Sequence, residues 1–120
     1  MKKFHAALVV LVASGAGLAA QAAFAADIEA GRALVEATNC AACHGARLNN
    51  PVSDAYPKLA GQHADYTYYA LRQYQMGNAN PAIGRDNAIM RAQVQGMSES
   101  DLRNMAAYIA SLSGDLTVRK

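Results

Sequence analysis

Hydrophobic residues recur at helical spacing along much of the chain, and the pattern predicts an all-α protein. The clearest stripe has apolar positions three or four residues apart, at Leu102, Met105, Ala106, Ile109 and Leu112. Ser98 and Asp101 approximate a capping box before this stripe, and Gly114 predicts its end. Met97 and Leu102 are placed to form a hydrophobic staple across the predicted start.

Three weaker patterns predict further helices. A mixed apolar stripe covers residues 27–37, with Asp27 as its candidate N-cap. Gly31 interrupts that stripe at a cost of about 1 kcal/mol relative to Ala, and a close approach by another helix would explain it. Residues 63–76 also show helical spacing, and a short helix is predicted near residues 87–93.

The remaining segments read as loops, and no stretch indicates a β-strand. Residues 45–62 are rich in Gly, Pro, Asn and Asp and have little periodicity. Such a long loop is uncommon in a small domain unless it has a function, such as lining a cofactor. The fold class expected from pattern alone is therefore all-α.

The N-terminus has the three parts of a secretory signal peptide. Lys2 and Lys3 precede an apolar run over residues 6–20, and small residues around Phe24 resemble a cleavage site. The apolar run is shorter than the roughly 20 residues that a membrane-spanning helix needs. We expect residues 1–25 to be removed, which leaves one small domain over residues 26–120 in the bacterial periplasm. No membrane span is expected in the mature protein.

Net charge excludes one class of function. The whole chain carries 11 basic and 9 acidic residues, a formal net charge of +2. Without Lys2 and Lys3, nine basic residues balance the nine acidic ones, which all follow residue 26. A neutral domain lacks the basic surface typical of nucleic-acid binding.

Both cysteines of the chain lie in one motif, Cys40-Ala-Ala-Cys43-His44, which allows several chemistries. A disulfide would close a very short loop and restrict the unfolded chain little. A redox dithiol is usual in a βαβ context, which the pattern does not show. Zinc would need four ligands, and a set that includes His63 could supply them, but the adjacent Cys43 and His44 make tetrahedral closure awkward.

Covalent attachment of haem c is the more specific interpretation, because Cys-x-x-Cys-His is its signature. Cys40 and Cys43 would each add to one vinyl group of the porphyrin, and His44 would be the proximal iron ligand. The haem would also enlarge a core that is marginal at this chain length. One such motif predicts one haem.

The second axial position of the iron has several candidates after residue 25: His63 and the methionines 76, 90, 97 and 105. Met97 and Met105 fit the staple and stripe of the last helix, which favours a core role. Met90 stands in the irregular segment before that helix, where the backbone can bend a thioether towards iron. The residues alone therefore favour Met90 modestly and leave His63 open.

The order of these motifs resembles the small bacterial class I cytochromes c, and especially one half of their two-haem members. "CAACHG" is followed by "YPKLAGQ", then by Met90 eight residues before Ser98, then by "DLRNMAAYIASL". The resemblance covers nearly all of residues 27–114. It implies the class I cytochrome c fold, with three main helices and loops wrapped around one covalent haem.

The resemblance also implies specific contacts. Gly31 would lie where the N- and C-terminal helices cross, against the last helix around Tyr108. The carbonyl of Pro57 would accept a hydrogen bond from the His44 ring, which would orient the ring and raise its basicity.

Further implied roles concern the haem itself. Met90 would be the distal ligand of a His/Met-ligated iron. The resemblance assigns no partners to the haem propionates; Tyr66, Gln62 and Arg85 are candidates from their side chains alone, since a phenol can hydrogen-bond a propionate.

We expect a periplasmic electron-transfer protein, a one-electron carrier and not an enzyme. Its partners would be transient redox proteins, a donor and an acceptor in a respiratory or dehydrogenase chain. One alternative is an electron-relay cytochrome subunit of a larger periplasmic oxidoreductase. A more distant alternative is a haem sensor or peroxidase with a labile distal ligand.

Overall fold

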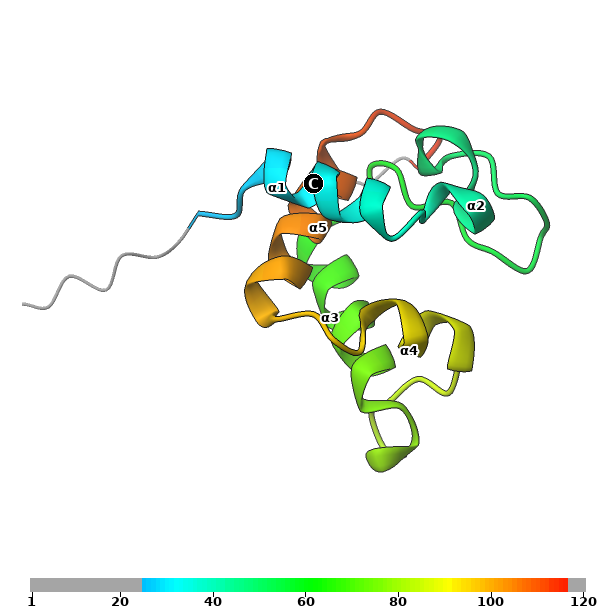
Figure 1. The fold of residues 1–120 in the computed structure, drawn as a ribbon. Coiled ribbons are helices and arrows are strands. Elements are labelled where there is room, and N and C mark those ends of the chain that lie inside the picture. Colours follow the sequence, from blue (N-terminus) through cyan, green and yellow to red (C-terminus); the bar gives the residue numbers. More distant parts are fainter. Residues whose placement is uncertain (1–24, 117–120) are drawn as a thin grey trace, which may run out of the picture.

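The computed structural model describes residues 25–116, and this part of the chain is helical without any β-strand (Figure 1). Its helices are α1 (Ile28–Ala37), α2 (Ala41–His44), α3 (Ala64–Met76), α4 (Ala88–Val94) and α5 (Glu99–Ser111). Two short 3-10 turns complete it, η1 (Ala46–Leu48) and η2 (Gly77–Ala79). Apart from its last residue, the predicted signal peptide lies outside the described residues. Among residues 25–116, no helix combines the length and the apolar character needed to cross a membrane.

The predicted starts of α1 and α5 are confirmed, because local capping sets both. The Asp27 side chain accepts a hydrogen bond from the Ala30 amide at 3.0 Å and caps α1. At α5, the Ser98 hydroxyl accepts from the Asp101 amide at 3.1 Å. The Asp101 carboxylate accepts in return from the Ser98 amide at 2.9 Å, which completes the capping box.

The end of α5 differs from the prediction. The helix stops at Ser111, three residues before Gly114, because Leu112 is already extended. Gly114 has another role: a Cβ there would lie 2.7 Å from the carbonyl oxygen of Ala60. This glycine therefore lets the C-terminal segment pass close to the loop that precedes α3.

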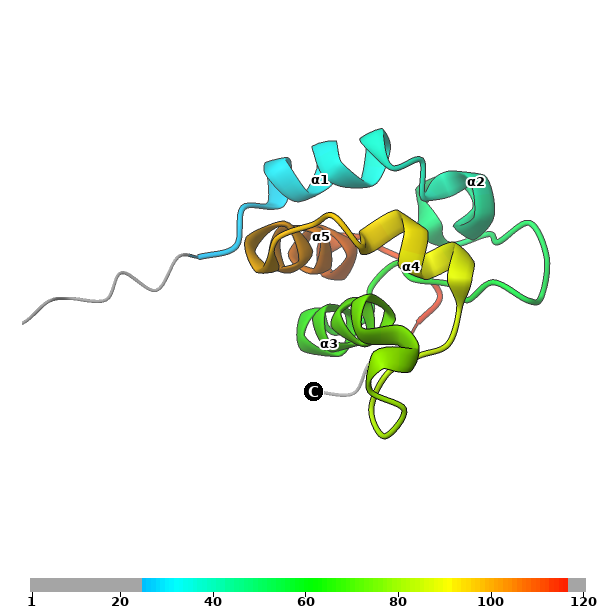
Figure 2. The ribbon, with the colours of Figure 1, turned by 60° about the horizontal axis from the view of Figure 1, so that its bottom comes forward.

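Helix α5 lies between α1 and α3, and α4 packs against α3 (Figure 2). The buried cluster draws residues from α1, η1, α3, α4 and α5: Val35, Leu48, Tyr68, Leu71, Val94, Leu102, Met105, Ala106 and Ile109. Four members of the predicted stripe of α5 belong to this cluster, and Leu112 packs against it from the edge. Figures 1 and 2 both place α2 and α4 at the same end of the molecule.

Gly31 lies at the crossing of α1 and α5, as its position in the sequence suggested. A Cβ at this residue would overlap the backbone carbonyl of Asn104. The closest approach is therefore at Asn104, about one helical turn before the expected position at Tyr108. The side chain of Asn104 also accepts a hydrogen bond from the Asp27 amide at 2.8 Å, which fixes the start of α1 against α5.

Gly31→Ala should destabilise the protein despite the better helix propensity of Ala. The new methyl group meets backbone, so α1 and α5 must separate, at a cost of about 1–3 kcal/mol typical of overpacking. Gly96→Ala is the matched control, since a Cβ at Gly96 meets nothing within 4 Å. Urea unfolding of the haem-loaded proteins checks this, and equal stability of Gly31→Ala and wild type would contradict it.

Candidate functional site

The Cys-x-x-Cys-His motif forms the short helix α2 and its N-terminal flank. The amide of His44 donates to the carbonyl of Cys40 at 3.0 Å, which closes one helical turn. Residues three apart in a helical turn lie on one face, so Cys40 and Cys43 present their thiols to the same side. Both thiols are free and half-buried.

Gly45 makes a tight turn possible directly after the motif. Its φ is +78°, a conformation that L side chains rarely adopt, and a Cβ would overlap the carbonyl of Asn50. The returning loop then donates from the Val52 amide to the Cys43 carbonyl at 3.1 Å. Sequence reasoning assigned no role to Gly45, although a glycine that follows the motif at once was an available signal.

The His44 ring is held in one orientation. It is 5 % exposed, and its Nδ1 lies 2.8 Å from the carbonyl oxygen of Pro57. A carbonyl only accepts, so Nδ1 carries the proton and donates, and Nε2 keeps its lone pair. This is the contact that the resemblance implied. Nε2 is buried and has no partner within the described chain, which suits a metal ligand.

The segment that carries Pro57 is fixed from several directions. The amides of Leu59 and Ala60 both donate to the Leu48 carbonyl, at 2.8 and 3.1 Å. The Gly61 amide donates to the carbonyl of Ile109 in the last turn of α5, at 3.0 Å. Helix α5 therefore supports the carbonyl that orients His44.

A surface contact reinforces the same segment from the C-terminal side. Lys58 pairs with Asp115 at 2.5 Å. This hydrogen bond lowers the pKa of the Asp115 carboxyl, and a contact with Asn49 adds to the effect. The contact with Asn49 is a hydrogen bond from the Asp115 amide to the Asn49 side chain at 3.0 Å.

The competing interpretations of the motif find no support in this geometry. Burial raises the pKa of the Cys40 thiol, whereas reactive dithiols have lowered values. Within residues 25–116, no group of three or more His, Cys, Asp or Glu residues could hold a metal ion, so the proposed zinc set is not assembled. Two thiols on one face and a buried, unpaired imidazole nitrogen fit a covalently attached haem.

Met90 is the third residue of α4, so the short helix predicted near residues 87–93 is confirmed, and only the irregular setting given to Met90 itself is wrong. Its amide donates to the Asn87 side chain at 2.9 Å, so Asn87 is the N-cap that sets where this helix begins. The helical preference of "AIMRAQV" outweighs the loop character of the residues before it. The Met90 side chain is half-buried at the edge of the core.

The other end of α4 is fastened to α3. The Gln75 side-chain amide donates to the carbonyls of Val94 and Met97, at 2.7 and 2.8 Å. With Asn87 at one end and Gln75 at the other, α4 has a defined position beside α3. Residue 87 was predicted as the start of this short helix but not as its cap, although an Asn three positions before Met90 is a recognisable cap signal, and Gln75 was assigned no role.

The other candidate distal ligands lie elsewhere. Met105 is buried in the core cluster, and Met97 packs against it. His63 is the exposed N-cap residue of α3, and its side chain makes no capping hydrogen bond.

Tyr66 in α3 contacts Arg85, which lies in the segment between α3 and α4. Arg85 Nη2 lies 3.4 Å from the Tyr66 hydroxyl, and its guanidinium lies 5.7 Å from the Tyr66 ring centroid and 5.5 Å from that of Tyr74. Its Nε donates to the Gln73 side chain at 2.8 Å. The hydrogen bond with Tyr66 raises the pKa of Arg85, so the cation is present at every working pH. Tyr66 itself is 54 % exposed.

Comparison with known proteins gives a consistent result. Residues 28–113 match the family model described as Cytochrome c. Cytochrome c4 of Stutzerimonas stutzeri is 35 % identical over 103 residues, which cover 83 % of this chain and 48 % of the relative. Cytochrome c-554(547) of Halothiobacillus neapolitanus is 34 % identical over 93 residues, which cover 73 % of this chain and 99 % of the relative.

A solved structure shows the same similarity. The crystal structure of reduced recombinant cytochrome c4 from Pseudomonas stutzeri aligns with a TM-score of 0.66 at 35 % identity, covering 77 % of this chain and 48 % of that one. The chain thus spans about half the length of the cytochrome c4 relatives it matches. The expected class I fold and similarity to one half of a two-haem cytochrome are confirmed. The chain belongs to the cytochrome c family and carries one haem c, attached covalently through Cys40 and Cys43.

Proposed function

We propose that this protein is a one-electron carrier whose haem iron is ligated by His44 and Met90. The observation that supports this most directly is the buried His44 ring. Its Nδ1 is held by the Pro57 carbonyl at 2.8 Å, while Nε2 has no partner in the described chain. When bound, the haem supplies an Fe(III)/Fe(II) couple that transfers one electron without forming or breaking a bond.

The chain's own residues tune this couple. The hydrogen bond to Pro57 raises the basicity of His44 and prevents the ring from turning. The thioether of Met90 favours the reduced state relative to a second imidazole. Capping by Asn87 and the contacts of Gln75 hold α4 in place, so the distal ligand moves little between the two oxidation states.

Tyr66 and Arg85 are proposed to face the haem propionates. Arg85 has no carboxylate partner among the ion pairs of residues 25–116. A planar guanidinium is well matched to a carboxylate, and the Tyr66 hydroxyl can also donate to one.

Electrons should leave and enter beside the attachment motif. Val52 is 66 % exposed, and its amide is bonded to the Cys43 carbonyl, so an apolar side chain is exposed next to the cysteines. Redox partners would dock there transiently, through an interface below ~1,200 Å². A neutral mature domain predicts a modest effect of salt on their association.

The proposed location is the periplasm, after removal of residues 1–25. The basic start, the short apolar run and the small residues before Ala26 support it, and so does the Cys-x-x-Cys-His motif, because bacteria attach haem to such motifs in the periplasm. A relay subunit and a haem sensor or peroxidase remain alternative predictions.

Spectroscopy of the purified protein tests the proposal. The oxidised form should show a sulfur-to-iron absorption band, and the reduced form should not bind carbon monoxide at neutral pH, because both axial positions are filled. The protein mass should exceed that of the processed chain by one haem. Carbon monoxide binding without a sulfur band would favour a sensor or peroxidase, and stable co-purification with a larger chain would favour a relay subunit.

A further inference from the structure

Three buried side-chain atoms in residues 25–116 have no hydrogen-bond partner: His44 Nε2, Thr67 Oγ1 and Arg91 Nε. The imidazole nitrogen is explained by the iron. Thr67 is only 6 % exposed, and a hydroxyl buried this deeply is costly when unpaired. Its partner should therefore be a group that is not part of the described chain.

The hydroxyl is not satisfied by its own helix. A helical Thr commonly donates to the carbonyl four residues earlier, as Thr38 does to Leu34 at the end of α1. The Thr67 amide bonds to the His63 carbonyl at 3.0 Å, but the hydroxyl does not.

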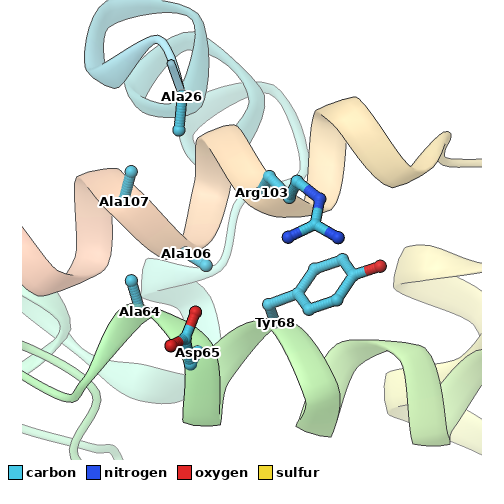
Figure 3. A pocket seen from close by; sticks show the side chains of 7 residues that line it. All are labelled: Ala26, Ala64, Asp65, Tyr68, Arg103, Ala106 and Ala107. Carbon is cyan, nitrogen blue, oxygen red and sulfur yellow. The ribbon is translucent and has the colours of Figure 1, made fainter. Parts of the chain in front are cut away.

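The phase of α3 shows which side of the helix Thr67 occupies. Tyr68 faces α5, where the Arg103 guanidinium lies 4.0 Å from its ring centroid. On one side of Tyr68, Asp65 borders a surface hollow of about 220 Å³ between α3 and α5 (Figure 3). Helical geometry puts Thr67 on the opposite side of Tyr68, and Tyr74, two turns later, lies on the same flank.

That flank carries a positive charge without a protein anion. Arg85 contacts Tyr66 in the first turn of α3 and Tyr74 in the third, so its guanidinium lies beside the part of the helix that contains Thr67. None of the ion pairs in residues 25–116 involves Arg85. A carboxylate would provide both the anion that Arg85 lacks and the acceptor that the Thr67 hydroxyl lacks.

We propose that Thr67 Oγ1 donates a hydrogen bond to a haem propionate. The edge of a haem is hydrocarbon except for its two propionates, so these are the acceptors it can offer to a hydroxyl. The hydrogen bond stabilises the ionised carboxylate and keeps the propionate deprotonated. This inference deepens the proposed function and depends on the haem site described above.

The test is the midpoint potential of the haem-loaded protein as a function of pH. Thr67→Val removes the hydroxyl and keeps the shape, while Thr67→Ser keeps a hydroxyl. Without the hydrogen bond the propionate should bind its proton about tenfold more tightly. The pH at which the plot of midpoint potential against pH changes slope should therefore rise by about one unit in Thr67→Val. Thr67→Ser should retain the wild-type profile.

Other ionisable groups share the region and must be separated from the propionate. They are His63, Tyr66 and Tyr74 on α3, Arg85 after it, and Arg91 on α4. The series is made in a His63→Gln background, so that the imidazole of His63 cannot contribute to the pH profile.

Several results would overturn the inference. One is an unchanged pH profile in Thr67→Val together with higher stability, as expected if a hydroxyl without a partner had been removed. Another is a pH profile of Thr67→Ser that is shifted as far as that of Thr67→Val. A changed sulfur-to-iron band with an unchanged pH profile would assign the hydroxyl to Met90 instead.

If Thr67→Val accumulates without haem, Thr67→Ala replaces it in the same comparison. A wild type without the sulfur band would contradict the proposed function, whereas an intact band with no effect of Thr67 would contradict this inference alone.

Discussion

Replacing both cysteines, Cys40→Ala with Cys43→Ala, should leave little folded protein after export. The domain expected over residues 26–120 has only 95 residues, so without haem it buries too little apolar surface to be comfortably stable. The double variant would also leave the His44 ring buried, with Nε2 unpaired because no iron is bound. Haem content from absorbance and mass, together with resistance to protease, measures the outcome.

Ala42→Ser is the matched control for the double variant. Ala42 lies between the two cysteines and is exposed, so a small polar side chain there should leave attachment and folding unchanged. Each single cysteine variant keeps one thioether and His44, and should retain part of the haem. A stable, colourless, helical domain from the double variant, made in cells that mature other c-type cytochromes, would show that the fold does not need its cofactor.

Met90→Ala should open the distal position, abolish the sulfur-to-iron band and lower the midpoint potential. The thioether favours the reduced iron, and its loss should shift the potential by on the order of 0.1 V or more, within the ~0.8 V that axial ligands span. Because Met90 also packs at the edge of the core, Met90→Leu should be made in parallel. Leu keeps the bulk of the side chain and removes the sulfur. Met90→Leu should therefore abolish the band and lower the midpoint potential, with less loss of stability than Met90→Ala.

Met97→Leu is the control for the distal ligand. Met97 is another methionine next to the core, and its replacement should leave both the band and the potential near wild type. A band that persists in Met90→Ala and disappears in Met97→Leu would move the ligand to Met97. A spectrum typical of two imidazoles in the wild type would indicate His63.

Helix starts could be predicted from the sequence because they depend on residues close in the chain. Asp27 and Ser98 each bond an amide three residues ahead, and both caps are present. The end of α5 was less predictable. Gly114 read as a local stop, but its small size serves a contact with Ala60, more than fifty residues earlier.

The site divides in the same way. Cys40, Cys43 and His44 lie within five residues that form one helical turn, so the attachment chemistry could be predicted from this short motif alone. The contact of Pro57 with His44 was implied by a family resemblance and not by local pattern, since it joins residues thirteen positions apart. The short helix around Met90 was predicted, but its position beside α3 was not, because the contacts of Gln75 with the far end of α4 fix it.

The sequence by itself determined that the chain is helical, where most helices begin, and that one haem c is attached at one motif. These properties arise from spacing and capping within a few residues. Only the tertiary structure decided where α1 crosses α5, which carbonyl orients His44, how α4 presents Met90, and that the Thr67 hydroxyl is buried without a partner. Each of these depends on which distant segments pack together, and that choice is made by the buried core as a whole.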